Sequence, residues 1–293
     1  MCGRCPTNDA MTDDLPAGDP AFVLAELEGR SERFETPCGS GAMVWHAWGG
    51  GPVLVLLHGG NGSWRHWVRT IPVLSHDYRV VAADLPGLGE SAEAPEPPTQ
   101  DGIARIVADG LDTVIGPQTR YAIAGFSFGG MISSIVAALH GGRVRSLTVN
   151  GPGGMGGRAR TLELVPVRHK QGAARIEAHR TNLAELMIHD PAKIDALALA
   201  LQEWHSVRNR LRTPLLSRSM ATVDAFARVR ATVRAIYGEF DAPAYPDIRK
   251  RETMLRAVRP DLDFRVIPGA GHWTAYEAPE QFNAMLLKML RRD

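Results

Sequence analysis

Short apolar runs separated by glycine-rich or polar segments mark the first half of the chain. Residues 52–57 form a continuous apolar run, and residues 79–83 and 121–124 form similar short runs. Such runs predict strands that are buried on both faces, as in a parallel sheet. The segments 64–74 and 100–115, which lie between them, predict helices. The pattern therefore indicates that strands and helices alternate.

The alternation continues toward the end of the chain. Further strands are predicted at residues 32–36, 42–48, 144–150, 233–238 and 262–267. The first two are joined by the turn Gly39-Ser40-Gly41 and predict an antiparallel pair at an edge. Together these elements predict an α/β fold, with a mostly parallel sheet and helices on both faces.

A serine lies at the junction between a predicted strand and a predicted helix. The sequence there is Gly125-Phe126-Ser127-Phe128-Gly129. In a nucleophile elbow the serine is held in a strained backbone conformation, so the residues two before and two after it must be very small. The glycines meet this demand. The pentapeptide alone is equally compatible with an ordinary strand-to-helix turn.

An acid and a histidine follow two later strands. Asp241 comes after the strand at 233–238, and His272 comes after the strand at 262–267 and a glycine-rich turn. A serine becomes nucleophilic when a base removes its proton, and the base needs an acid to orient it. The chain order Ser127, Asp241, His272 is the order typical of an α/β-hydrolase triad. These three residues are the predicted catalytic set.

The first buried strand ends in His58-Gly59-Gly60-Asn61-Gly62. Glycines at this place let the backbone approach a substrate oxygen. We therefore predict an oxyanion hole made by the backbone N–H groups of Phe128 and Gly60, with Asn61 as the alternative second donor. His58 is expected to shape the loop by hydrogen bonding rather than to act as a base.

Three other residues could compete for the role of the acid. Asn150 ends the sixth strand, where some relatives carry the acid, but an amide has no charge with which to stabilise an imidazolium. Glu239 is the nearest rival to Asp241. Asp84 follows an earlier strand and is expected to have a structural turn role.

The chain resembles the α/β-hydrolase family over about residues 32–291. The resemblance rests on His58-Gly59, the segment 84–91, Ser127, the segment 238–241, and Gly271-His272. It implies an eight-stranded, mostly parallel sheet with a helical cap inserted after strand 6, and it implies the triad roles given above. Chemistry of this kind requires no metal and no organic cofactor.

Two stretches also resemble the meta-cleavage-product hydrolases, which split carbon–carbon bonds. They are residues 150–156, and His272-Trp273 followed by Glu277 and Phe282-Asn283. That subgroup has a longer glycine-proline run where this chain has residues 60–64. It also uses a lid arginine to hold the substrate carboxylate, and the corresponding position here lies near residues 202–204, with no arginine from there until Arg208. The candidate substrate contacts are Asn61, Trp273, Trp204 and Arg208.

Residues 153–220 break the alternation, because they are helical in pattern and contain no strand candidate. Ile194, Leu197, Leu201 and Trp204 recur at helical spacing and predict a stripe that packs against the core. We expect a disordered tail at 1–20, a core at 21–152 and 221–293, and a helical cap at 153–220.

The predicted function is hydrolysis of a small or medium carboxylic ester through an acyl-enzyme. The alternative within enzymes is carbon–carbon hydrolysis of a vinylogous diketone of the meta-cleavage type. A hypothesis from another class is a catalytically idle ligand receptor on the same fold. The intact set of Ser127, Asp241 and His272 argues against the receptor, which would not need a nucleophile.

Composition limits the partners. The chain has 293 residues, 44% of them hydrophobic, three cysteines and a net charge of +1. Nothing in this charge points to nucleic acid or to a membrane surface, and no apolar stretch is long enough to span a bilayer. Residues 1–20 lack a signal-peptide profile. We expect a cytoplasmic protein that acts on a small molecule, and a homodimer stays open.

Overall fold

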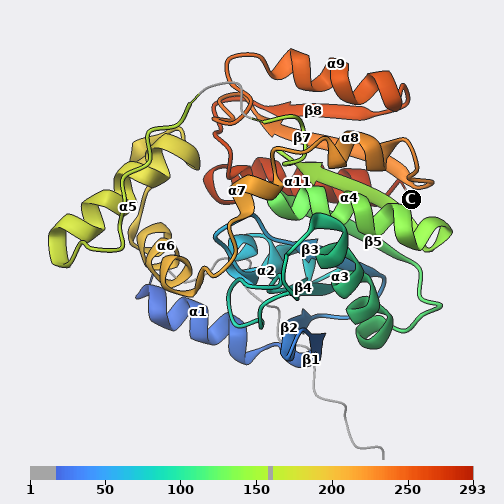
Figure 1. Cartoon of the computed structure of the whole chain (residues 1–293), viewed down its shortest axis with the longest axis horizontal. Coiled ribbons are helices and arrows are strands. Elements are labelled where there is room, and N and C mark those ends of the chain that lie inside the picture. Colours follow the sequence, from blue (N-terminus) through green and yellow to red (C-terminus); the bar gives the residue numbers. More distant parts are fainter. Residues whose placement is uncertain (1–17, 158–160, 293) are drawn as a thin grey trace, which may run out of the picture.

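The computed structural model describes residues 18–157 and 161–292. Its centre is one eight-stranded sheet with the strand order β1-β2-β4-β3-β5-β6-β7-β8 (Figure 1). β1 and β2 pair antiparallel, β2 is antiparallel to β4, and the other neighbours are parallel. The predicted α/β fold is confirmed. The strands are β1 Glu32–Cys38, β2 Gly41–Trp48, β3 Val53–Leu57, β4 Arg79–Ala83, β5 Tyr121–Phe126, β6 Val144–Asn150, β7 Thr232–Gly238 and β8 Asp263–Ile267.

Helices cover both faces of this sheet. The helices are α1 Pro20–Gly29, η1 Trp64–Trp67, α2 Ile71–Leu74, α3 Gln100–Ile115, α4 Phe128–His140, η2 Gly141–Arg143, α5 Gly172–Leu186, η3 Pro191–Lys193, α6 Ala196–Arg208, α7 Thr213–Leu216, α8 Ala221–Phe226, α9 Ile248–Val258, α10 Thr274–Glu277 and α11 Pro279–Leu290. Buried side chains of α3, α4, α8 and α9 belong to one hydrophobic cluster. Those of α1, α2 and α11 belong to a second cluster.

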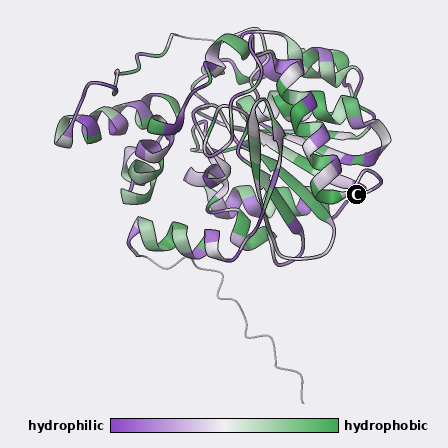
Figure 2. Ribbon diagram, turned by 60° about the horizontal axis from the view of Figure 1, so that its bottom comes forward, coloured by the Kyte–Doolittle hydropathy of each residue, from purple (hydrophilic) through white to green (hydrophobic). Residues whose placement is uncertain are grey.

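The continuous apolar runs are explained by these two clusters. Val53, Val55 and Leu57 of β3 belong to the first cluster, whereas Leu54 and Leu56 belong to the second. Successive side chains of a strand point to opposite faces, so a strand covered by helices on both faces is apolar at every position. Figure 2 shows this as strongly hydrophobic strands in the middle of the molecule.

The helix predicted over residues 64–74 is wrong. The chain forms the 3₁₀ turn η1, then breaks, and starts the short helix α2 with Pro72 in its first turn. A proline in the middle of a continuous helix would lack the backbone N–H that the helix requires, whereas the first turn tolerates it. The side chain of Ser63 caps η1 by accepting a hydrogen bond from the N–H of Arg65 at 3.2 Å.

Helix α1 was not predicted from the sequence. Asp19 caps it, because its carboxylate accepts a hydrogen bond from the N–H of Ala21 at 2.9 Å. Residues 1–17, which make up most of the tail expected at 1–20, lie outside the described residues. No helix in the described part of the chain is both long and apolar enough to cross a bilayer.

The segment between β6 and β7, here called the insertion (residues 151–231), contains helices and no strand in its described residues. Its helices α5 and α6 lie together at one side of the sheet, at the left in Figure 1. Ile194 and Leu201 are buried in the second hydrophobic cluster, with Leu197 packed against it. Three residues of the predicted apolar stripe therefore pack on the core, whereas the fourth, Trp204, does not belong to this cluster.

Candidate active site

Ser127 lies directly between β5 and α4, at the carboxyl edge of the sheet. Its φ is +52° and its ψ is −113°, which is a strained conformation for a residue with a side chain. A Cβ on Gly125 would lie 2.3 Å from the carbonyl oxygen of Gly129, and one on Gly129 would lie 2.4 Å from the carbonyl oxygen of Leu57. Only glycine fits at both places, as the sequence pattern predicts for a nucleophile elbow.

Asp241 and His272 form a buried hydrogen-bonded pair. The distance between Asp241 Oδ2 and His272 Nδ1 is 2.8 Å, and both side chains are almost fully buried. They follow β7 and β8, which are parallel neighbours, so their loops meet at the same edge. This contact orients the imidazole and holds its proton on Nδ1, which leaves Nε2 as the nitrogen that can accept a proton.

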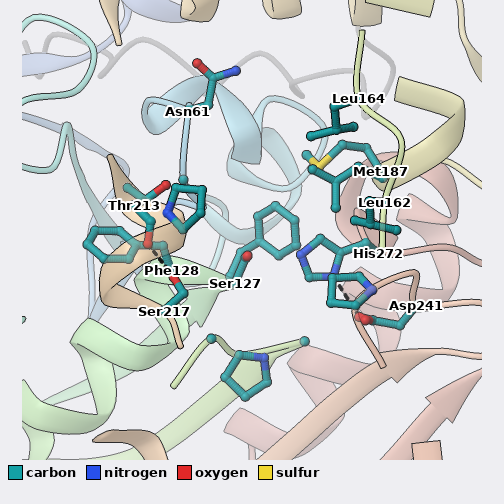
Figure 3. A pocket seen from close by; sticks show the side chains of 18 of the residues that line it. Asn61, Ser127, Phe128, Leu162, Leu164, Met187, Thr213, Ser217, Asp241 and His272 are labelled. Carbon is teal, nitrogen blue, oxygen red and sulfur yellow. Dashed lines mark hydrogen bonds and ion pairs between the residues drawn. The ribbon is translucent and has the colours of Figure 1, made fainter. Parts of the chain in front are cut away.

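The three predicted catalytic residues all line one cavity of about 860 Å³. Figure 3 shows Ser127, His272 and Asp241 following one another along it. In this structure the Ser127 hydroxyl makes no hydrogen bond to His272 or to any other described residue. Catalytic hydrogen bonds are often long without a bound substrate and shorten in the complex.

The predicted oxyanion-hole residues, Gly60 and Phe128, also line this cavity. Phe128 is the first residue of α4, and the first N–H groups of a helix have no partner within it. Neither the N–H of Phe128 nor that of Gly60 donates a hydrogen bond to a described residue. Asn61, the alternative donor, lines the cavity as well and has a φ of +49°. The arrangement offers unpaired donors to a negative oxygen beside Ser127.

His58 shapes the loop, as expected. Its Nδ1 lies 2.7 Å from the carbonyl oxygen of Gly59, and its Nε2 accepts a hydrogen bond from the N–H of Leu85 at 2.8 Å. Burial lowers the pKa of His58 to about 4, although the contact with Gly59 opposes this. The imidazole is therefore neutral and has both nitrogens engaged, which leaves none to act as a base.

Asp84 has the predicted structural role. Its two carboxylate oxygens accept hydrogen bonds from the N–H groups of Trp64 and Glu90, each at 2.8 Å. Burial raises the pKa of Asp84 to about 6. The carboxylate thus holds the loops on either side of β4 and lies outside the cavity lining.

Glu239 and Asn150 are both engaged elsewhere. Glu239 is exposed and accepts a hydrogen bond from the N–H of Gly269 at 2.9 Å. The side-chain oxygen of Asn150 accepts a hydrogen bond from the Thr274 hydroxyl at 3.0 Å. Of the acids weighed from the sequence, Asp241 is the one that contacts His272.

Three predicted substrate contacts are not brought to the cavity. Trp204 contacts the guanidinium groups of Arg65 and Arg208, which lie 3.9 and 4.1 Å from its ring centre. Trp273 is buried and stacks on Tyr276 with ring centres 4.2 Å apart. None of Trp204, Arg208 and Trp273 lines the cavity, whereas Asn61 does. The spacing of residues in the sequence does not show which side of an element faces the cavity.

Sequence reasoning missed a buried histidine cluster behind the Gly59–Gly60 loop. His66 Nδ1 accepts a hydrogen bond from the N–H of Gly59 at 3.2 Å, and its ring centre lies 4.8 Å from that of His205. His205 Nε2 lies 2.8 Å from the hydroxyl of Ser63. Burial holds the pKa of both histidines well below the usual value. They come from η1 and α6, so no local sequence pattern could have paired them.

A possible metal-ligand group lies away from the cavity. Ligand atoms of Glu28, His46 and Glu90 lie within 4.8 Å of one another. However, Glu28 pairs with the Arg65 guanidinium at 2.7 Å, and Glu90 lies 3.9 Å from that of Arg33. These cations already balance the carboxylates, so we assign no metal to the group.

Comparison with known proteins agrees with this fold. The model of the alpha/beta hydrolase family matches residues 54–285. A serine at a strand-to-helix elbow on an eight-stranded, mostly parallel sheet is the arrangement of that family. The chain belongs to the alpha/beta hydrolase family and is an enzyme of this class.

Particular relatives differ in what they act on. The chain is 31% identical over 287 residues to the dihydrolipoyllysine-residue acetyltransferase component of the acetoin cleaving system of Pseudomonas putida, covering 94% of this chain and 71% of that protein. It is 27% identical over 266 residues to a 2-hydroxy-6-oxononadienedioate/2-hydroxy-6-oxononatrienedioate hydrolase of Burkholderia vietnamiensis, covering 83% and 88%. The solved structure of esterase RhEst1 from Rhodococcus sp. ECU1013 matches with a TM-score of 0.73 at 22% identity, covering 88% and 98%.

Proposed function

We propose that this protein hydrolyses small or medium carboxylic esters through an acyl-enzyme on Ser127. The observation that carries the proposal is the hydrogen-bonded pair of Asp241 and His272, which lines the same cavity as a strained, unpaired serine. A buried acid–histidine pair beside a serine is the arrangement that acyl transfer requires.

Each group has a defined role in the proposed reaction. His272 takes the proton of the Ser127 hydroxyl while the serine oxygen attacks the ester carbonyl. The N–H groups of Phe128 and Gly60 stabilise the negative oxygen of the tetrahedral intermediate. His272 then gives the proton to the leaving alcohol, and Asp241 stabilises the charged imidazolium throughout. A water molecule, activated by His272, releases the acid and restores the serine.

The test is turnover of p-nitrophenyl butyrate by the purified protein and by its Ser127→Ala variant. We expect the variant to lose at least about 10⁴-fold in kcat, because removal of the nucleophile removes the covalent route. Ser134→Ala is the matched control, since this buried serine on α4 donates to the carbonyl oxygen of Gly130 and does not line the cavity. Labelling of Ser127 by a fluorophosphonate, located by mass spectrometry, gives a second readout. Equal turnover by the Ser127→Ala variant would overturn the proposal.

A second candidate is carbon–carbon hydrolysis of a ring-opened dienoate. It is favoured by the relative from Burkholderia vietnamiensis, which is named for that reaction. In this reaction His272 would first help to tautomerise the substrate. A paired assay of p-nitrophenyl butyrate and a meta-cleavage dienoate, each with the Ser127→Ala control, distinguishes the two. Turnover that strongly prefers the dienoate would replace the ester proposal.

A further inference from the structure

The charges around the cavity are unequal. Among the described residues that line it, two are arginines, Arg218 and Arg251, and one is an acid, Asp241. Asp241 is already hydrogen-bonded to His272. Neither arginine has a carboxylate within 4.0 Å in the described part of the chain. Two positive charges and one negative charge therefore line the cavity, which leaves an excess of one positive charge among its described side chains.

Arg251 is the buried member of this pair. It lies on α9 and is only 9% exposed. Its guanidinium donates to the carbonyl oxygens of Met155 at 2.6 Å, Gly157 at 2.5 Å and Pro243 at 3.3 Å. These contacts hold the group in place with neutral partners only, and two of its five N–H groups find no partner among the described residues. A buried cation is costly unless an anion accompanies it.

Tyr237, at the end of β7, provides a second unsatisfied donor. Its side chain is 1% exposed and lines the cavity, and its hydroxyl has no hydrogen-bond partner among the described residues. Burial raises the pKa of this hydroxyl, the nearby charge of Asp241 raises it further, and the charge of Arg251 opposes both effects. The phenol thus stays protonated, as a donor, and it lines the same cavity as Arg251. Buried polar groups are nearly always satisfied, so an unpaired hydroxyl at a cavity calls for a ligand atom.

We propose that Arg251 and Tyr237 form an anion site that binds a carboxylate of the substrate, so that the preferred substrates are esters carrying a free carboxylate. The planar guanidinium suits a carboxylate, and the phenol hydroxyl adds a neutral donor to the same group. Arg218, exposed at the same cavity, adds to the field that attracts an anion. The proposal rests on the ester-hydrolase function given above and names its substrate class.

The experiment compares matched charged and neutral esters. One pair is mono-p-nitrophenyl glutarate and p-nitrophenyl pentanoate, which places the carboxylate on the acyl side. The other pair is 3-carboxyphenyl butyrate and phenyl butyrate, which places it on the alcohol side. The readout is the ratio of kcat/KM for charged over neutral ester within each protein, because a general loss of activity or of folded protein cancels in this ratio.

We expect the unmodified enzyme to prefer the charged ester in at least one pair. The ratio should fall about tenfold or more in Arg251→Gln, and less in Tyr237→Phe, since Arg251 provides a full positive charge with its hydrogen bonds, whereas the phenol provides one neutral donor. Arg256→Gln is the control, because Arg256 lies on the same helix, pairs with Glu252 and does not line the cavity. A ratio near one in both pairs, or a ratio unchanged in Arg251→Gln, overturns the anion site.

Binding separates this site from the catalytic proposal. In the Ser127→Ala protein, calorimetric titration with glutarate measures the anion site without turnover. We expect the Kd for glutarate to rise about tenfold or more when Arg251→Gln is added, and to stay unchanged when Arg256→Gln is added. If no ester is turned over but glutarate binds in this way, the ester function fails and the anion site stands. If glutarate does not bind, or binds equally well without Arg251, the anion site fails.

Discussion

The carboxylate of Glu277 accepts a hydrogen bond from the N–H of Gly271, the residue before His272, at 2.7 Å. The same carboxylate accepts from the N–H groups of His189 at 3.0 Å and Asp190 at 2.8 Å, which follow α5. Glu277 is 2% exposed. One buried acid therefore ties the histidine loop to the insertion, and Glu277 is a positioning residue for His272.

We predict that Glu277→Gln lowers kcat about tenfold with a smaller change in KM. An amide offers one oxygen and one N–H₂ group, so one of the three backbone donors faces another donor and loses its partner. A buried donor without a partner costs about 1–3 kcal/mol of stability. We expect part of this cost to appear as a displacement of the loop that carries His272. Kinetics on p-nitrophenyl butyrate and urea unfolding measure the two effects. Glu280→Gln, at an exposed acid on α11, is the control. Unchanged kcat in Glu277→Gln would show that the tie does not position His272.

Gly151 leaves no room for a side chain next to the acid–histidine pair. It has a φ of +50°, and a Cβ there would lie 2.4 Å from Asp241 Oδ2 and 3.0 Å from His272 Nδ1. We predict that Gly151→Ala lowers kcat about 100-fold, because a small displacement of catalytic groups costs this much. Gly141→Ala is the matched control. Gly141 has a φ of +54° with nothing within 4 Å of the added Cβ. Gly141→Ala should lose about 1–3 kcal/mol of stability through backbone strain and keep its activity. Similar kcat values in the two variants would contradict the prediction.

Asp241→Asn should retain the shape of the site and lose its chemistry. The amide no longer stabilises the imidazolium and favours the wrong tautomer of His272, so kcat should fall about 10⁴-fold. Glu239→Gln changes the neighbouring acid, which holds Gly269 and not His272, and should retain its activity. The steady-state rates of the two variants decide which acid serves the histidine. A larger loss in Glu239→Gln than in Asp241→Asn would reassign the role.

The free energy of unfolding should fall as the pH falls from about 6.5 toward 4. The pKa values of His46 and His58 are lowered to about 4 and those of His66 and His205 lie well below the usual 6.5, in each case chiefly through burial. In this window each of these histidines binds a proton more readily in the unfolded chain than in the folded one. Each histidine therefore lowers the free energy of unfolding by up to about 1.4 kcal/mol for each unit by which the pH falls. Asp84, with its pKa raised to about 6, acts in the opposite direction below pH 6. Four histidines outweigh one aspartate.

The matched variants for this pH effect are His205→Gln and His169→Gln. Urea unfolding between pH 7 and pH 5 should show a shallower slope for His205→Gln, which removes one buried histidine. His169 is exposed, so its replacement should leave the slope unchanged. A stability that does not change with pH in the unmodified protein would argue against a neutral, buried histidine cluster.

Several elements, and the positions of the three candidate catalytic residues after strands, followed from the sequence alone. Strands at 79–83 and 144–150 and the helix at 100–115 have their predicted bounds. These segments have strong local patterns: apolar runs for strands between two helical layers, and 3.6-residue periodicity for the helix. The break between η1 and α2 was missed, although Pro72 was the local signal that marked it.

What the sequence by itself determined is that Ser127, Asp241 and His272 each follow a strand and so meet at one edge. Parallel strands place their carboxyl ends together wherever they lie in the sheet, and this makes a catalytic edge predictable from strand ends. What only the tertiary structure decided is which other side chains surround the serine. Arg251 and Tyr237 line the cavity and Trp204, Arg208 and Trp273 do not, because its walls come from distant segments. Their relative placement depends on packing between helices and sheet, which no short-range periodicity encodes.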